Sequence, residues 1–132
     1  MKAVFNDLQE PLSPLDGAPV CDRKGLITLL DDARNRKPFG CELVGENGYK
    51  LTLGISNEIG FVQHSRADGE PPYLVAFTAE RCCDQERCEF LIGGTPTPIG
   101  QRFCLPIRAV KEIAAHFIEL GERSQAYSWE EI

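Results

Sequence analysis

The sequence predicts an α+β fold, in which an antiparallel, meander-like β-sheet of five to seven strands packs against an N-terminal and a C-terminal helix. Apolar residues recur at helical spacing near both ends of the chain, and between these ends they alternate with the period of a strand. The predicted strands are joined by short connections, which favour antiparallel neighbours. A chain of 132 residues can bury a substantial core, so we expect one domain over residues 1–132.

The C-terminal helix carries the clearest signals. Its apolar face follows the i, i+3, i+4, i+7 spacing and consists of Val110, Ile113, Ala114, Phe117 and Ile118. Pro106 fits the first helical turn, where a missing N–H leaves nothing unsatisfied. Gly121 is suited to the left-handed conformation that ends a helix. After it, Tyr127 and Trp129 fall on one side of an extended segment.

The N-terminal third predicts a strand over residues 1–6, then a loop rich in Pro and Gly, then a helix. This helix begins after Asp22, which is a favourable N-cap, and runs to about Arg34. Pro38 prevents its continuation. The helix presents an apolar stripe to the predicted sheet.

The middle of the chain has the period of strands. We predict strands over residues 41–44, 49–55, 59–64, 73–77, 88–92 and 101–105. Asn47-Gly48 is a strong hairpin signal between the first two of these strands. Residues 93–98 contain two Gly and two Pro, and we predict a turn-rich loop there.

Charge and hydropathy limit the function. There are 14 basic and 20 acidic residues, a net charge of −6, and the isoelectric point is about 4.9. Affinity for nucleic acid comes mainly from clustered Lys and Arg, so we expect no nucleic-acid partner and favour a basic protein. No apolar run is long enough to cross a bilayer and the N-terminal residues lack the apolar core of a signal peptide. We therefore expect a cytoplasmic protein with no membrane partner.

Cysteines are the most metal-like feature. The six are Cys21, Cys41, Cys82, Cys83, Cys88 and Cys104. Cys82-Cys83-x4-Cys88 lacks the CxxC spacing of a zinc knuckle, and neither histidine is near it in sequence. We therefore predict no metal ligands and no cofactor, with most of the cysteines reduced and buried. A small metal- or ligand-binding domain that uses Cys82, Cys83 and Cys88 stays open as the alternative.

Catalytic patterns are missing from the sequence. His64 and Ser65 are neighbours in a predicted strand and so face opposite ways, which prevents a dyad. His116 lies beside the apolar stripe of the C-terminal helix. Gly93-Gly94 precedes Thr-Pro and lacks the Lys-Ser/Thr of a phosphate loop. We predict no catalytic residue and no enzymatic activity.

What remains is a surface. Acidic side chains gather at the predicted turns and at the C-terminal end: Glu46, Glu58, Asp68, Glu70, Glu80, Asp84, Glu86, Glu130 and Glu131. Such residues solvate a surface, and together they also form an acidic rim that suits a basic groove. Trp129 is either a core residue under the helix or an interface anchor. The candidate partner-binding residues are Asp68, Glu70, Tyr73, Asp84, Glu86, Trp129 and Glu130.

Several segments resemble one family in their order along the chain. They are the Tyr49–Ile55 strand, Gly60-Phe61-Val62-Gln63-His64, the strand end Phe90–Gly94, Leu105-Pro106-Ile107, Phe117-x-x-x-Gly121 and Trp129-Glu130. In this order they are similar to the bacterial polymorphic-toxin immunity proteins of immunity family one. The resemblance covers roughly residues 40–132, and the cysteines are no part of it.

The resemblance implies a function. Members of this family are small cytoplasmic proteins encoded beside a secreted toxin, often a deaminase-type toxin that acts on nucleic acid. They bind the toxin domain and block its active site. The matching residues, such as Gly54, Phe117 and Gly121, belong mostly to the scaffold, so the resemblance assigns no contact residue. For the free protein we expect a monomer or a weak homodimer, and a module that pairs with its own copy through an open sheet edge is a further alternative.

Overall fold

The computed structural model describes residues 1–8, 14–33, 39–56, 58–79, 82, 86–92 and 95–132. The helices are α1 (Arg23–Ala33) and α2 (Ile107–Leu120), with a short 3-10 turn η1 (Gln101–Phe103). The strands are β1 (Ala3–Asp7), β2 (Pro19–Val20), β3 (Phe39–Gly45), β4 (Tyr49–Ser56), β5 (Ile59–Arg66), β6 (Leu74–Phe77), β7 (Arg87–Ile92), β8 (Thr95–Gly100), β9 (Leu105–Pro106) and β10 (Ser128–Glu131).

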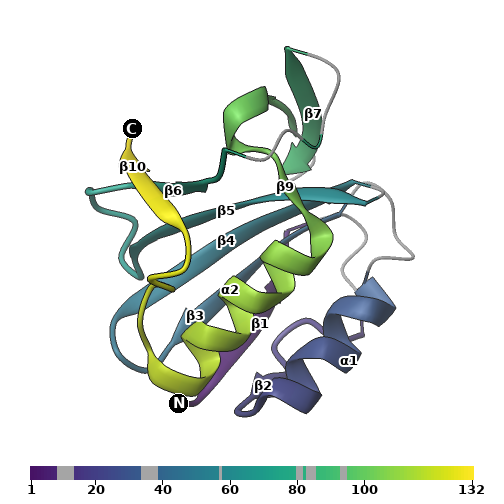
Figure 1. Ribbon diagram of the computed structural model, residues 1–132. Coiled ribbons are helices and arrows are strands. Elements are labelled where there is room, and N and C mark those ends of the chain that lie inside the picture. Colours follow the sequence, from purple (N-terminus) through teal and green to yellow (C-terminus); the bar gives the residue numbers. More distant parts are fainter. Residues whose placement is uncertain (9–13, 34–38, 57, 80–81, 83–85, 93–94) are drawn as a thin grey trace.

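One large antiparallel sheet organises the molecule (Figure 1). Its strand order is β10-β6-β5-β4-β3-β1-β2, and β9 also pairs with β5. Strands β3 to β6 form the predicted meander, because each pairs with its neighbour in the chain through a short connection. The sheet has eight strands, of which β2 and β9 are only two residues long. The α+β prediction is confirmed.

Both helices cover the same face of the sheet and lie against each other (Figure 1). The apolar stripe predicted for α2 is fully buried, since Val110, Ile113 and Phe117 are each 0% exposed. Large side chains of the sheet, among them Phe5 and Leu51, fill the same core. Burying one such side chain contributes about 1.5–3 kcal/mol to the free energy of unfolding.

Three contacts hold the C-terminal end of α2. Gly121 has φ 71° in the left-handed region, and its N–H donates to the carbonyl of Phe117 at 2.7 Å, as predicted for a helix C-cap. Asn47, in the β3–β4 turn, donates through Nδ2 to the carbonyl of Gly121 at 2.8 Å. The ammonium of Met1 donates to the carbonyl of Ile118 at 2.8 Å and places a positive charge at the negative end of the helix dipole. These contacts fix the chain that leaves α2.

The β7–β8 ribbon packs across the opposite face of the sheet, where Phe61 meets Phe90 edge to face at 5.2 Å between ring centroids. The ring of Phe61 also fills the space above Gly54, where a Cβ atom would collide with it. Gly54 is thus part of the scaffold. The predicted strand 88–92 exists, but it belongs to this separate ribbon and not to the main sheet.

The prediction of a loop over residues 93–98 is wrong for residues 95–98, which lie in β8. Gly93 and Gly94 lie outside the described residues. Pro96 and Pro98 stand opposite Leu91 and Glu89 in the ribbon. Alternate residues of a two-stranded ribbon direct their N–H outward, and a proline is tolerated there because it has no N–H to pair.

The prediction of a strand over residues 101–105 is also wrong. This segment forms η1, closed by a hydrogen bond of 3.2 Å from the N–H of Cys104 to the carbonyl of Gln101, and then enters the short strand β9. Pro106 is the N-cap residue of α2 and not a residue of its first turn. The turn is stabilised by tertiary contacts, because Arg102 and Phe103 both pack on Phe77.

Candidate functional site

The loop between β5 and β6 holds three of the predicted partner-binding residues in an ordered turn. Asp68 pairs with Arg66 at 2.6 Å, and its other carboxylate oxygen accepts from the N–H of Glu70 at 2.9 Å. Tyr73 donates its hydroxyl to a backbone carbonyl of the same loop. The carbonyl of Tyr73 accepts from the N–H of Ile132 at 2.9 Å, so the loop lies beside the C-terminal residues. Asp68 and Glu70 are exposed.

Trp129 and Glu130 lie on β10, the strand at the same edge of the sheet. Trp129 stands opposite Ala76 of β6 on the face that carries the helices, and its indole Nε1 donates to the carbonyl of Ser124 at 3.0 Å. The indole is half-buried. Because successive strand residues face opposite ways, Glu130 turns to the other face, where Arg102 pairs with it at 3.1 Å.

Glu86 is exposed at the start of the β7–β8 ribbon, and its carbonyl accepts from the N–H of Gln101 at 2.9 Å. Asp84 lies outside the described residues. The structure therefore brings five of the predicted residues to one edge and leaves Glu86 on the ribbon. We call these five the edge surface: Asp68, Glu70, Tyr73, Trp129 and Glu130.

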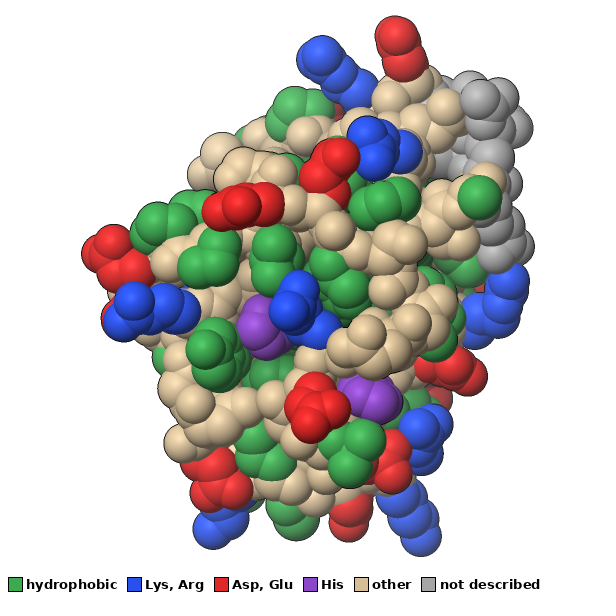
Figure 2. Space-filling view, turned by 60° about the vertical axis from the view of Figure 1, so that its left-hand side comes forward, with side chains coloured by type: hydrophobic (Ala, Val, Ile, Leu, Met, Phe, Trp, Pro, Cys, Tyr) green, Lys and Arg blue, Asp and Glu red, His purple; other side chains and the backbone are tan. Residues whose placement is uncertain are grey.

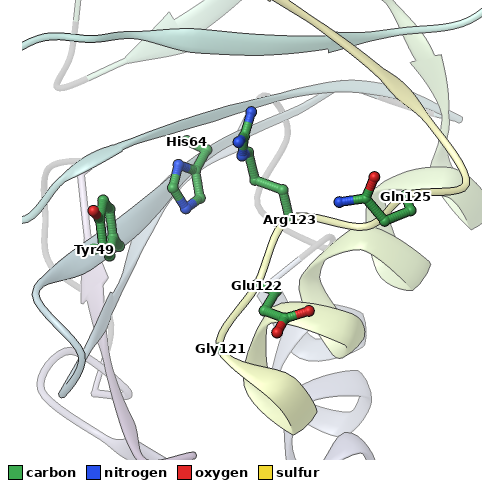
Figure 3. A pocket seen from close by; sticks show the side chains of 6 residues that line it. All are labelled: Tyr49, His64, Gly121, Glu122, Arg123 and Gln125. Atoms are coloured by element: carbon green, nitrogen blue, oxygen red, sulfur yellow. The ribbon is translucent and has the colours of Figure 1, made fainter.

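A hollow beside the edge surface was missed by sequence reasoning (Figure 3). It has a volume of about 400 Å³ and is lined by Tyr49, His64, Gly121, Glu122, Arg123 and Gln125. A second hollow of about 210 Å³ is lined by Tyr49, His64, Ser65, Arg66, Pro72, Leu74 and Arg123. The two share Tyr49, His64 and Arg123, so we treat them as one site, the histidine hollow. In Figure 2 a basic side chain lies against a histidine near the centre of this face, with hydrophobic side chains on several sides.

The fold itself leaves this hollow open. Tyr49 stands opposite Arg66, and His64 stands opposite Leu51, so Tyr49 and His64 are diagonal neighbours on the helix-bearing face of β4 and β5. The helix α2 contacts His64 through Phe117 in its last turn and ends at Leu120. The left-handed cap then turns the chain, and the residues that follow it form the remaining wall.

His64 is enclosed by aromatic rings. Tyr49 stacks on it with 5.1 Å between centroids and 24° between planes, while Phe117 and Trp129 meet it edge to face at 6.0 and 6.2 Å. Only 8% of His64 is exposed. This burial, and secondarily the positive charge of Arg123, lowers the pKa of His64 to about 4. The imidazole is therefore neutral at pH 7.

Arg123 forms the charged wall of the hollow. Its guanidinium carbon lies 5.9 Å from the centroid of the Trp129 ring, within reach of a cation–π contact. Figure 3 shows the guanidinium beside His64 and the carboxylate of Glu122 turned away from both.

The residues predicted to be non-catalytic form no catalytic pair in the described part of the chain. Ser65 follows His64 on the strand, and its buried Oγ has no hydrogen-bond partner among the described residues. His116 sits on α2, and its buried Nε2 likewise has no partner within the described ranges. A neutral histidine without an oriented nucleophile does not assemble acyl-transfer chemistry.

The cysteine-based alternative loses its ligand set. Cys88 is disulfide-bonded, so it supplies no thiolate, and Cys83 lies outside the described residues. Cys82 donates its thiol to the carbonyl of Cys104 at 2.9 Å. In the part of the chain that the structure describes, no three His, Cys, Asp or Glu residues are grouped to hold a metal ion.

Of the other thiols, two are buried and unreactive and one is exposed on the surface. Burial raises the pKa of Cys41 well above its usual value, with Asp7 and Glu42 adding to the effect. Burial, and then Cys82, raises the pKa of Cys104 to about 11. Both thiols are therefore protonated at pH 7 and poor nucleophiles. Cys21 is an exposed thiol and is therefore an exception to the predicted burial of most cysteines.

Among the described residues, no helix is long and apolar enough to cross a bilayer.

A sheet covered by helices on one face, with an edge that displays charged and aromatic side chains, defines a small α+β protein. The family whose description is Immunity protein Imm1 matches residues 19–131, most of the chain. The chain therefore belongs to the Imm1 family of immunity proteins, and this membership implies an immunity function. The resemblance seen in the sequence is confirmed, and the match extends it to include β2 and α1. No curated protein matches the chain.

Proposed function

We propose that this protein binds a cognate secreted toxin domain in the cytoplasm of the producing cell and covers the active site of that domain. The toxin is nucleic-acid-directed and of the deaminase type, and the inhibitor itself catalyses nothing. Family membership supports the immunity role. The observation that carries the docking surface is the edge surface, where exposed acidic side chains lie beside half-buried Tyr73 and Trp129.

Charge supports this assignment. A protein that acts on nucleic acid presents basic residues around its substrate cleft, and the inhibitor has a net charge of −6. Opposite charges speed the encounter, while aromatic anchors at the centre of an interface slow its dissociation. A stable interface buries about 1,200–2,000 Å² in total, which requires more than the loop around Asp68. The edge surface and the adjoining ribbon with Glu86 supply a continuous candidate.

The test compares two charge reversals of equal size. Asp68→Lys with Glu70→Lys changes the edge surface, and Asp32→Lys with Glu112→Lys changes exposed positions on the two helices. The purified toxin domain is assayed for activity with each inhibitor. We expect the first variant to lose inhibition and the second to inhibit like the wild type. Equal inhibition by both would place the interface elsewhere, and failure of the wild type to inhibit would refute the proposed function.

We propose a monomer for the free protein. Strand β10 is the last in the strand order of the sheet, and an open edge of this kind is also a route to self-pairing. Two acidic residues, Glu130 and Glu131, lie on this short strand and oppose the approach of a second copy. Light scattering at increasing protein concentration measures the molar mass in solution, and we expect it to stay at that of a monomer.

A further inference from the structure

We infer that the histidine hollow receives an acidic side chain, Asp or Glu, of the toxin domain, so that Arg123 and His64 are partner-binding residues. This inference rests on the proposed function and deepens it. The acidic edge surface attracts the partner as a whole, and the hollow beside it offers one contact of the opposite sign.

The first observation is the state of Arg123. Five other basic residues have a carboxylate partner: Arg23 with Glu119, Lys50 with Glu42, Arg66 with Asp68, Arg102 with Glu130 and Lys111 with Asp31. Within the described residues, Arg123 forms no such ion pair, although the protein carries an excess of acids. Its guanidinium carbon lies 5.9 Å from the centroid of the Trp129 ring. The N–H donors of the guanidinium are not engaged by a carboxylate of the described residues.

The second observation is the state of His64. The side chain is more than nine-tenths buried and lines both parts of the hollow. Its contacts in the described part of the chain are with rings and with the charge of Arg123, and no hydrogen bond of its nitrogens is among them. The buried side-chain atoms without a partner in the described residues are Ser65 Oγ and His116 Nε2, so the His64 nitrogens reach the open space of the hollow. A neutral imidazole offers one N–H donor and one acceptor, so an incoming acceptor would complete it.

The shape and composition of the hollow favour a carboxylate. A guanidinium presents paired N–H donors that match a carboxylate in a bidentate arrangement. Tyr49 lines both parts of the hollow and stacks on His64, and Pro72 and Leu74 add apolar surface to the smaller part. Apolar surroundings of this kind lower the local dielectric constant and strengthen a polar contact. A volume of about 400 Å³ admits the side chain of Asp or Glu with room for its own backbone.

A polyanion is disfavoured at the same place. Glu122 lines the hollow, and Asp68 and Glu70 lie on the loop that follows Arg66 at its rim. These charges repel an extended phosphate backbone but leave room for a single negative charge on a mainly basic protein. In the rest of the interface the inhibitor is negative and the toxin positive, and here the signs are exchanged. One such pair also fixes the register of docking and disfavours toxins that lack the acidic residue.

The experiment measures the dissociation constant of the complex with the cognate toxin domain by calorimetry. Arg123→Met retains a long unbranched side chain and removes the charge, and His64→Phe retains a ring and removes its hydrogen-bonding atoms. The matched control, Arg23→Met, removes an exposed guanidinium on α1. We expect Arg123→Met to weaken binding at least tenfold, His64→Phe to weaken it severalfold and Arg23→Met to leave it unchanged. Melting temperatures of all variants verify that each is folded.

The partner side chain is found by charge exchange. Arg123→Glu should abolish binding, and one Asp→Lys or Glu→Lys variant of the toxin should restore it. Wild-type affinity for Arg123→Met would overturn the inference while the wild-type complex still supports the proposed function. Absence of a wild-type complex would remove both. A single-stranded oligonucleotide that binds the wild type and not Arg123→Met would also overturn it, because the hollow would then be a phosphate site.

Discussion

The guanidinium of Arg102 lies 3.1 Å from the carboxylate of Glu130 and so joins η1 to the last strand of the sheet. The same guanidinium covers two rings, with its central carbon 4.7 Å from the centroid of Phe77 and 5.1 Å from that of Phe103. Arg102 therefore forms an ion pair with Glu130 and, independently of it, packs on the rings of Phe77 and Phe103.

Substitutions at these two positions should differ in their effect on stability. Both side chains are more than two-fifths exposed, so we expect Glu130→Gln to lower the free energy of unfolding by less than about 1 kcal/mol. Arg102→Ala also removes the stacking on Phe77 and Phe103, and we expect it to cost about 1–2 kcal/mol. Urea denaturation of both variants measures the two values. An equal loss would show that the ring contacts contribute nothing.

Salt should act on the rate of association more than on the rate of dissociation. The net charge of −6 attracts a basic toxin over a distance that dissolved ions screen, with a Debye length of about 8 Å at physiological ionic strength. We expect the association rate to fall at least tenfold between about 0.05 and 0.5 M salt, with a dissociation rate that changes severalfold at most. Stopped-flow fluorescence gives both rates. An association rate that ignores salt would contradict electrostatic steering.

Trp129 should contribute to stability in two separable ways. Trp129→Ala removes a half-buried indole that packs on the main core, and we expect a loss of about 2–3 kcal/mol, less than for a fully buried ring. Trp129→Phe retains most of the packing and loses the hydrogen bond to the carbonyl of Ser124, for which we expect about 1 kcal/mol. Thermal and urea unfolding measure both. A fully stable Trp129→Ala that no longer inhibits would assign the indole to the interface alone.

Stability should depend on pH through His64. Its pKa is about 6.5 in the unfolded chain and about 4 in the folded protein, where burial and then Arg123 disfavour the charged ring. Between these values the unfolded chain binds more protons, so the free energy of unfolding decreases as the pH falls from about 6.5 to about 4. We expect a loss on the order of 2 kcal/mol.

The control for this pH effect is His64→Phe, which cannot titrate at that position. Every other titratable group, including Glu122 in the same hollow, is present in both proteins. The difference between the wild type and the variant isolates the histidine. Parallel curves for the two proteins would show that His64 is not protonated on unfolding.

Much of the fold could be predicted because it depends on local patterns. The apolar stripe of α2, the cap at Gly121 and the turn at Asn47-Gly48 each follow from a few adjacent residues, and all three are observed. The N-cap at Asp22 is confirmed by its hydrogen bond of 2.7 Å from the N–H of Gly25. Asp22 precedes α1 (Arg23–Ala33), and the predicted helix end at about Arg34 lies outside the described residues.

The errors lie where distant contacts decide. The prolines of β8 argue against a central strand, but in a two-stranded ribbon both strands are edge strands, where a proline is tolerated. Residues 101–105 end in the apolar run Phe103-Cys104-Leu105, and the packing of Arg102 and Phe103 on Phe77 accompanies a turn there instead of the predicted strand. No local pattern contains either fact.

The histidine hollow was unpredictable for the same reason. Tyr49, His64 and Arg123 come from three segments that only the sheet and the end of α2 bring together. A weak signal did exist, since His64 continues the apolar, helix-facing row of Gly60 and Val62 on β5 with a polar ring. A polar residue at the end of such a row marks the place where the covering helix stops.

The hydrogen bond from Asn47 to the carbonyl of Gly121 has one more consequence. It ties the tip of a hairpin to the end of a helix, and Tyr49 and Arg123 each lie two residues from one of its ends. Both walls of the recess are thereby anchored before a partner binds, so binding requires little loss of conformational entropy in the inhibitor. We expect a preorganised binding site of this kind to have a slow dissociation rate for its partner, which an inhibitor that must keep its target occupied requires.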